Sequence, residues 1–159
     1  MIGDAQVMTH LQAELKILLT GINQTFVHYR MLQHWGFGQL GHREYKASIK
    51  AMKEADALME RIFLLDGLPN LQDLGKLRIG EDVPELLACD LALELDSQRA
   101  LKSGIAQCER VLDYVSRDLL QGMLDEAEER IDFLETQLAL IEKMGLPNYL
   151  QAQMGEESH

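Results

Sequence analysis

Apolar residues recur at every third or fourth position along most of the chain, which is the spacing of an amphipathic helix. The two clearest series are Leu11, Leu15, Leu18 and Ile22 near the beginning, and Ile131, Leu134, Leu138 and Ile141 near the end. No segment shows the pattern expected of a strand. The pattern predicts an all-α fold over residues 1–159, with helices at 4–35, 42–66, 83–111, 113–143 and 146–153.

The predicted helices end at clear stop signals. Residues 67–70 and 145–148 both read Gly-Leu-Pro-Asn, and Gly36, Gly38 and Gly41 separate the first two helices. Glycine accepts the left-handed conformation that closes a helix, and proline prevents the helix from continuing. A chain of 159 residues is also a usual size for one hydrophobic core. The sequence therefore predicts a single domain.

The segment 67–82 is too long for a routine connection between neighbouring helices. Its length, about 50 Å when extended, exceeds the roughly 40 Å of a helix of this size. The segment can therefore run the whole length of the bundle, so that the second and third helices lie parallel. One long crossover of this kind distinguishes the ferritin-like four-helix bundle from a simple up-and-down bundle.

The predicted helix at 42–66 has two apolar stripes on nearly opposite sides. The first stripe is Ala51, Leu58, Ile62 and Leu65, and the second is Tyr45, Ile49, Met52, Met59 and Phe63. A helix on the surface of a monomer needs only one such stripe. The second stripe predicts an interface with another chain, although scattered exposed apolar residues are also common on monomers.

Composition narrows the possible partners. The chain has 26 acidic against 15 basic residues, a net charge of −11, which argues against nucleic-acid binding and allows cations, metal ions included. The first residues do not form a signal peptide, and no apolar run is long enough to span a membrane. Cys89 and Cys108 fall on one predicted helix about 28 Å apart, too far for a disulfide. These features predict a cytoplasmic protein with reduced cysteines.

The chain resembles bacterioferritin, the haem-containing branch of the ferritin superfamily, over essentially its whole length. The matching segments are Gly3-Asp4, Ile22-Asn23-Gln24, Met52-Lys53, residues 67–82, Asp90-Leu91-Ala92-Leu93-Glu94, residues 114–118 and residues 145–153. The resemblance implies a 24-subunit cage of two-fold dimers that stores a ferric mineral. It also implies a di-iron ferroxidase centre within each bundle and a haem b between the two subunits of a dimer.

Most of the implied ferroxidase centre is missing. The six ligand positions of the family are occupied here by Leu18, Ala51, Glu54, Glu94, Ala127 and Arg130. Of these, only Glu94 is a family ligand, which leaves at most a weak residual iron site. The positions of the histidines agree with this loss. The predicted helices at 83–111 and 113–143 contain no histidine, and the sole Glu-x-x-His is Glu156 to His159 in the polar tail.

Arg130 could supply the positive charge that the missing metal ions would have provided. We expect its guanidinium to pair with Glu54 and Glu94 in the same volume. The alternative is that Arg130 turns outward and that tyrosine or backbone donors hold Glu94.

Met52 occupies the haem-ligand position of the family, and a thioether is a suitable donor to haem iron. Two copies related by a two-fold axis would ligate one iron from opposite sides. The other residues matching the family pocket are Leu19, Asn23, Phe26, Met31, Tyr45, Ile49 and Asp56. Without the resemblance, a single methionine is more simply explained as a core or interface residue.

Two surface sites of the family can be compared in the same way. Leu68, Glu81 and Glu85 match the region where a small ferredoxin docks to reduce the mineral, although they are equally well explained as loop and cap residues. Lys46 and Lys50 replace the histidine and aspartate of an iron site on the cavity side, and lysines repel cations.

Together these features predict an iron-storage subunit that contributes haem and shell. Fe(II) oxidation would then fall to a second bacterioferritin subunit type in a mixed cage. One alternative is a working ferroxidase with remodelled ligands drawn from Glu14, Glu54, Glu94 and Glu128. Another is a structural or electron-transfer module for which mineral storage is incidental.

Overall fold

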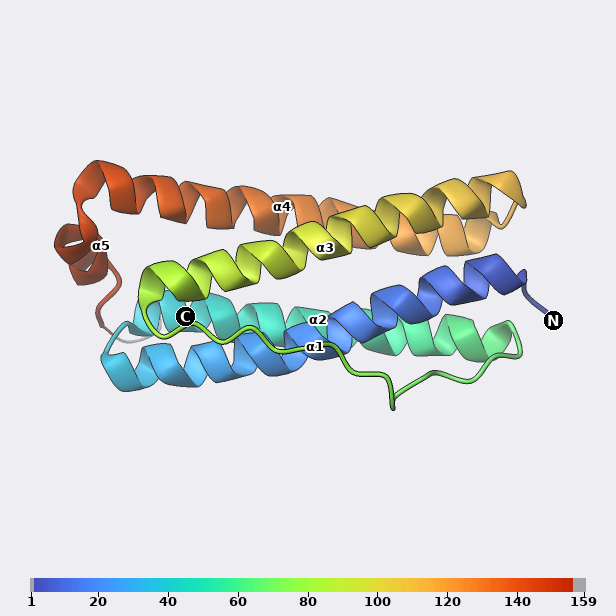
Figure 1. Ribbon diagram of the computed structural model, residues 1–159, viewed down its shortest axis with the longest axis horizontal. Helices are drawn as coiled ribbons and strands as arrows, with labels where there is room; N and C mark the ends of the chain where they lie inside the picture. Colours follow the sequence, from blue (N-terminus) through green and yellow to red (C-terminus); the bar gives the residue numbers. More distant parts are fainter. Residues whose placement is uncertain (1, 156–159) are drawn as a thin grey trace.

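The computed structural model describes residues 2–155 and shows four long helices side by side with a short fifth helix across one end (Figure 1). The helices are α1 (Ala5–Trp35), α2 (Gly38–Leu64), α3 (Val83–Arg110), α4 (Tyr114–Met144) and α5 (Leu146–Ala152). Apart from one isolated bridge between Phe37 and Gly155, these residues form no β-structure. The predicted four-helix bundle with a short C-terminal helix is therefore confirmed.

The start of the second helix was predicted wrongly, because α2 begins at Gly38 and not at residue 42. Only Gly36 acts as a stop, with a left-handed φ of 87° that closes α1. Gly38 and Gly41 are buried inside α2 instead. A Cβ at Gly41 would lie 3.5 Å from Leu32 Cβ, so this glycine allows α1 and α2 to pack closely where they meet.

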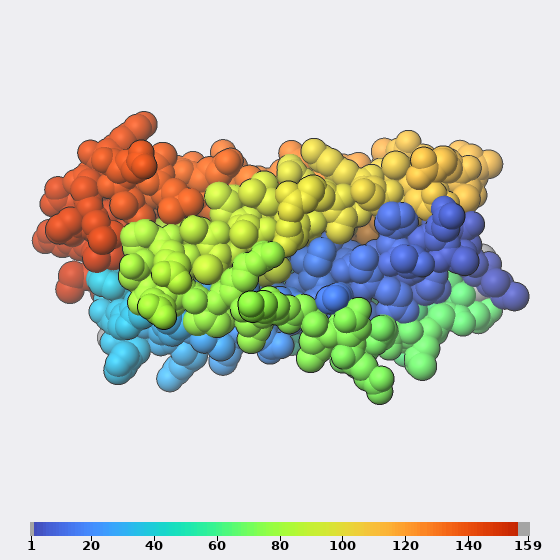
Figure 2. All heavy atoms as spheres, in the orientation of Figure 1, coloured from blue at the N-terminus to red at the C-terminus, as the bar shows by residue number. Residues whose placement is uncertain are grey.

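The long crossover between α2 and α3 runs back along the bundle, so that α2 and α3 point in the same direction (Figure 1). In the space-filling view the crossover lies over the surface of α1 (Figure 2). Leu68, Leu71, Leu74 and Leu77 of this segment remain exposed. The crossover is therefore held by something other than burial of its leucines.

Polar side chains of α1 hold the crossover through its backbone. Four of them accept hydrogen bonds from crossover N–H groups: Gln12 from Asn70 (2.9 Å), Thr20 from Gly75 (3.1 Å), Gln24 from Arg78 (3.1 Å) and His28 from Gly80 (3.1 Å). Gln12 also donates to the carbonyl of Leu68 at 2.8 Å. The four acceptors are spaced by multiples of four residues and so lie on one face of α1.

Thr20→Val tests this attachment, because valine keeps the shape of threonine and removes the hydroxyl. The N–H of Gly75 loses its acceptor, so we expect the free energy of unfolding to fall by about 1–2 kcal/mol in urea titrations. Thr9→Val is the matched control, since the exposed Thr9 bonds only back to Ala5 within α1. Equal losses in the two variants would contradict a role for Thr20 in holding the crossover.

The interior has two apolar blocks with a polar layer between them. One block contains Leu11, Leu15, Leu58, Ile62 and Leu101, and the other contains Leu32, Leu40, Leu86, Leu134 and Tyr149. Between them along each helix lie buried or half-buried polar residues: Gln24, Thr25 and His28 of α1, Glu44 and Ser48 of α2, Asp90 and Ser97 of α3, and Arg130 of α4. This layer contains most of the buried ionisable side chains.

Candidate functional site

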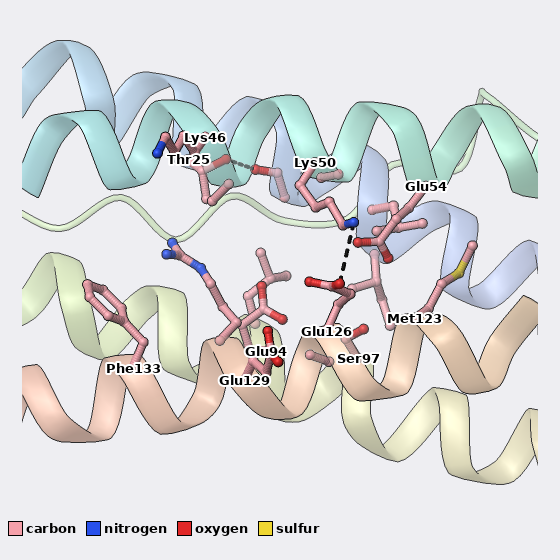
Figure 3. Close-up of a pocket in the computed structure, with 18 of the residues that line it drawn as sticks. Thr25, Lys46, Lys50, Glu54, Glu94, Ser97, Met123, Glu126, Glu129 and Phe133 are labelled. Atoms are coloured by element: carbon pink, nitrogen blue, oxygen red, sulfur yellow. Dashed lines mark hydrogen bonds and ion pairs between the residues drawn. The ribbon is translucent and has the colours of Figure 1, made fainter. Parts of the chain in front are cut away.

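A hollow of about 290 Å³ opens between the four long helices, on the side where α2 and α4 barely touch (Figure 3). All six residues at the expected metal-ligand positions line it: Leu18, Ala51, Glu54, Glu94, Ala127 and Arg130. The fold therefore brings together the positions that the sequence singled out. Leucine and alanine offer no ligand atom, so Glu54 and Glu94 are the two possible metal donors of this set.

The two carboxylates of the hollow are poorly neutralised. Burial and the neighbouring Glu94 raise the pKa of Glu54 to about 7, although Lys50 acts in the opposite direction. Burial also raises the pKa of Glu94 to about 7, against the effect of Arg130. Neither carboxylate makes a hydrogen bond or an ion pair of its own in residues 2–155. At neutral pH each is therefore poised between its charged and its protonated form.

The expected pairing of Arg130 with Glu54 and Glu94 is wrong. The Arg130 guanidinium instead contacts the carboxylates of Glu44 and Asp90, the latter at 3.7 Å. It does not turn outward either, since its side chain is 16% exposed. Glu44 and Asp90 are almost fully buried, whereas Glu54 is half-buried beside Lys50. The guanidinium therefore neutralises two of the most deeply buried carboxylates, which would otherwise be uncompensated buried charges.

His28 completes this buried network, and sequence reasoning did not single it out. Its Nδ1 lies 2.9 Å from Asp90 and 3.6 Å from Glu44, while its Nε2 accepts the N–H of Gly80. Burial lowers the pKa of His28, but the two carboxylates outweigh burial and raise the pKa to about 9. The Gly80 N–H opposes this rise, because Nε2 can accept its hydrogen bond only while that nitrogen carries no proton.

His28, Glu44 and Asp90 form the one group of three close metal-ligating side chains in the described part of the chain. Both ring nitrogens of His28 are already used, and Arg130 already supplies a positive charge to the carboxylates. The group is therefore a closed charge network and does not fit a metal ion. Gln24 and His28, four residues apart on α1, both bond to Asp90, at 3.0 and 2.9 Å, and this spacing was the sequence signal that could have revealed the group.

The residues of the expected haem site lie on the outer face of α1 and α2. Met52 is 52% exposed, and Ile49 and Tyr45 are half-buried one and two turns earlier on α2. On α1, Leu19 and Met31 are half-buried, and Asn23 and Phe26 are exposed. Tyr29 joins the two helices, with its ring 5.0 Å from Tyr45 and 5.6 Å from Phe26. An exposed thioether with apolar and aromatic neighbours suits a haem ligand, so these residues fit that group.

The two stripes of α2 separate as expected. Leu58 and Ile62 are fully buried and Leu65 is 4% exposed, so the first stripe faces the bundle. The second stripe faces outward: Met52 and Phe63 are exposed, and Met59 is half-buried. Asp56 is exposed one turn after Met52. A single subunit thus leaves this face uncovered.

Comparisons with known proteins agree with this architecture. The ferritin-like domain family matches residues 8–144. The bacterioferritin of Mycobacterium leprae is 43% identical over 143 residues, 90% of each chain. That of Brucella melitensis is 41% identical over 149 residues, 94% of this chain and 92% of the relative, and that of Rhodobacter capsulatus is 40% identical over 143 residues, 90% and 89%.

The chain belongs to the bacterioferritin family. In this bacterioferritin chain, Leu68 lies shortly after the end of α2, whereas Glu81 lies just before α3 and Glu85 lies within it. All three are exposed, but one subunit does not bring them together, so a common docking site would need two subunits. Glu85 also lies in the first turn of α3, where Asp82 caps its N–H at 2.9 Å.

Lys46 and Lys50 are exposed at the mouth of the hollow (Figure 3). Lys50 makes an ion pair with Glu126 at 3.5 Å, which links α2 to α4 across the opening.

Cys89 and Cys108 are free thiols. No helix in residues 2–155 combines the length and apolar character needed to cross a membrane. Glu156 and His159 lie outside the described residues.

Proposed function

We propose that this bacterioferritin subunit contributes shell and haem to an iron-storage cage and leaves Fe(II) oxidation to a second subunit type. Two oxidisable iron ions need a shared set of carboxylate and histidine ligands, typically two glutamates and two Glu-x-x-His pairs. The observation that carries the proposal is that the six corresponding positions around the hollow retain only Glu54 and Glu94 as donors. Two carboxylates cannot hold two iron ions in this arrangement.

The outer face of α1 and α2 supports the haem part of the proposal. Met52 from each subunit of a two-fold dimer would hold the haem iron, and Tyr45, Ile49 and Phe26 would cover the haem faces. When bound, the haem would provide an electron path for reduction of the ferric mineral. The exposed leucines of the crossover and the second stripe of α2 are consistent with burial in a 24-subunit cytoplasmic cage.

Oxygen-dependent Fe(II) oxidation tests the missing centre. Apoprotein prepared from this chain alone is loaded with Fe(II) without oxygen and then mixed with aerated buffer. We expect Fe(III) absorbance to rise only at the rate of the protein-free control, because the hollow lacks a ligand set for two iron ions. A bacterioferritin with all six ligands serves as the positive control.

A fast oxygen-dependent phase from the pure chain would reject the proposal and favour a ferroxidase with remodelled ligands. Co-purification from the native cell gives a second check. A second band of bacterioferritin size, with complete ligands, would support the division of labour. A single band accompanied by normal iron loading would contradict it.

A further inference from the structure

Gly80 is the point at which the crossover enters the interior of the protein. Among residues 67–82, it alone is buried. A Cβ on this residue would lie 2.3 Å from the backbone nitrogen of Leu86 in α3, so only glycine fits at this position. The N–H of Gly80 donates to Nε2 of His28 at 3.1 Å in a buried hydrogen bond. The crossover is therefore attached most deeply at a side chain that can titrate.

The ring of His28 can hold Gly80 in only one protonation state. A backbone N–H is always a donor, so Nε2 carries no proton in this hydrogen bond. Nδ1 carries the ring proton and donates it to Asp90 Oδ1 at 2.9 Å. The same oxygen of Asp90 accepts from Gln24, whose carbonyl oxygen accepts the N–H of Arg78. A second proton, on Nε2, would place two donors face to face and break the bond to Gly80.

The charged groups around His28 favour that second proton. Burial opposes it, but Asp90 of α3 and Glu44 of α2 outweigh burial and raise the pKa of the ring to about 9. Arg130 of α4 contacts both carboxylates and opposes a further positive charge beside them. The Gly80 N–H opposes it as well, since its bond exists only on a ring without that proton. Protonation and attachment of the crossover thus compete for one nitrogen atom.

We propose that this hydrogen bond is a pH-sensitive fastening, in which a second proton on His28 releases Gly80 and loosens the crossover from α1. Below about pH 9 the released ring binds more protons than the attached ring. The ratio of attached to released crossover therefore falls as pH falls, by at most about tenfold for each pH unit.

Glu44 sets the lower end of this pH range. Its pKa is about 7, so near that pH it takes up a proton and attracts the second proton of His28 less strongly. The loosening should therefore be steepest between pH 9 and pH 7 and level off below pH 7. The fastening involves neither iron nor haem, so it goes beyond the proposed function and does not depend on it.

Hydrogen exchange of the full-length protein, followed by mass spectrometry, tests the fastening. After correction for the intrinsic exchange rate at each pH, we expect protection of the Gly80 amide to fall from pH 9 to pH 7, by about a hundredfold at most. The Asn70 amide of the same crossover is the internal control, because its acceptor at 2.9 Å is Gln12, which does not titrate. Constant protection of Gly80, or equal changes at Gly80 and Asn70, would overturn the proposal without any variant.

His28→Gln gives a second readout, because glutamine offers one donor and one acceptor in place of the two ring nitrogens and does not titrate. Protection of Gly80 in this variant should be the same at pH 9 and pH 7. His34→Gln is the matched control, since His34 is an exposed histidine of the same helix, and it should keep the pH dependence of the unaltered chain. Loss of the pH dependence in His34→Gln, or its persistence in His28→Gln, would remove His28 as the group that controls attachment.

Discussion

Arg130→Met lowers the free energy of unfolding by about 3–5 kcal/mol, because it leaves two buried carboxylates without their cation. Methionine retains most of the apolar stem, so the loss comes from the charge and not from an empty space. Glu44 and Asp90 are 2% and 1% exposed, and His28 faces both of them with Nδ1 alone, so it does not replace the guanidinium. Urea unfolding at pH 8 and one fixed protein concentration measures the change.

Arg43→Met is the matched control for this substitution. Arg43 is exposed and, like Arg130, lies over the ring of Phe133; the guanidinium carbons are 4.0 Å and 5.9 Å from the ring centroid. An exposed contact of this type contributes about 0.5–1 kcal/mol. A loss in Arg130→Met no larger than that in Arg43→Met would contradict the buried network.

The loss in Arg130→Met should also depend on pH. Burial and the neighbouring Asp90 raise the pKa of Glu44 to about 7 even with Arg130 present, and removal of Arg130 raises this pKa further. The folded variant then holds a proton that the unfolded chain releases near its ordinary pKa, so its stability falls as pH rises. The gap between the variant and the unaltered chain should therefore narrow from pH 8 to pH 6. A constant gap over that range would show that Glu44 is not the group left unpaired.

We expect Met52→Leu to abolish the proposed haem binding and to leave the proposed assembly intact. Leucine has nearly the volume of methionine and is tolerated at apolar positions, but it offers no donor atom to iron. Met52 is 52% exposed, so the substitution leaves the interior of the bundle unchanged. Haem absorbance after reconstitution, measured on the peak from size-exclusion chromatography, gives the ratio of haem to protein. Release of stored iron by an external reductant should slow at the same time.

Met59→Leu controls for the loss of a methionine from the same outward stripe. Met59 is half-buried two turns after Met52 and packs against the apolar core. Its variant should keep the haem content of the unaltered chain. Equal haem content in Met52→Leu and the unaltered chain would remove Met52 as the ligand.

Much of the architecture follows from local sequence signals. The helix ends at Gly36, at Gly145 and at Asp82 are governed by the capping residue itself, and the length of residues 67–82 fixes the direction of α3. Gly38 and Gly41 misled the prediction for α2, because their role is close packing against α1, and tertiary contacts of this kind have no local signature.

The sequence predicts which residues line the hollow, but it does not predict which carboxylates Arg130 contacts. The six positions around the hollow follow from the family register, and the packing of the four long helices brings them to one region. Which carboxylate Arg130 contacts depends instead on the relative burial of Glu44, Asp90, Glu54 and Glu94. That burial is set by the packing of all four helices and by the crossover, and it cannot be calculated from the spacing of charges along one chain.

The hydrogen bonds between α1 and the crossover have a consequence for both faces of the protein. A slip of α1 by one residue turns its side chains by about 100° and separates Gln12, Thr20, Gln24 and His28 from their backbone partners together. The same slip would carry Leu18 away from the hollow and Tyr29 away from Tyr45. The crossover, which has no regular secondary structure, therefore fixes the rotation of α1 about its own axis. Both the hollow and the outer face of α1 and α2 depend on that rotation.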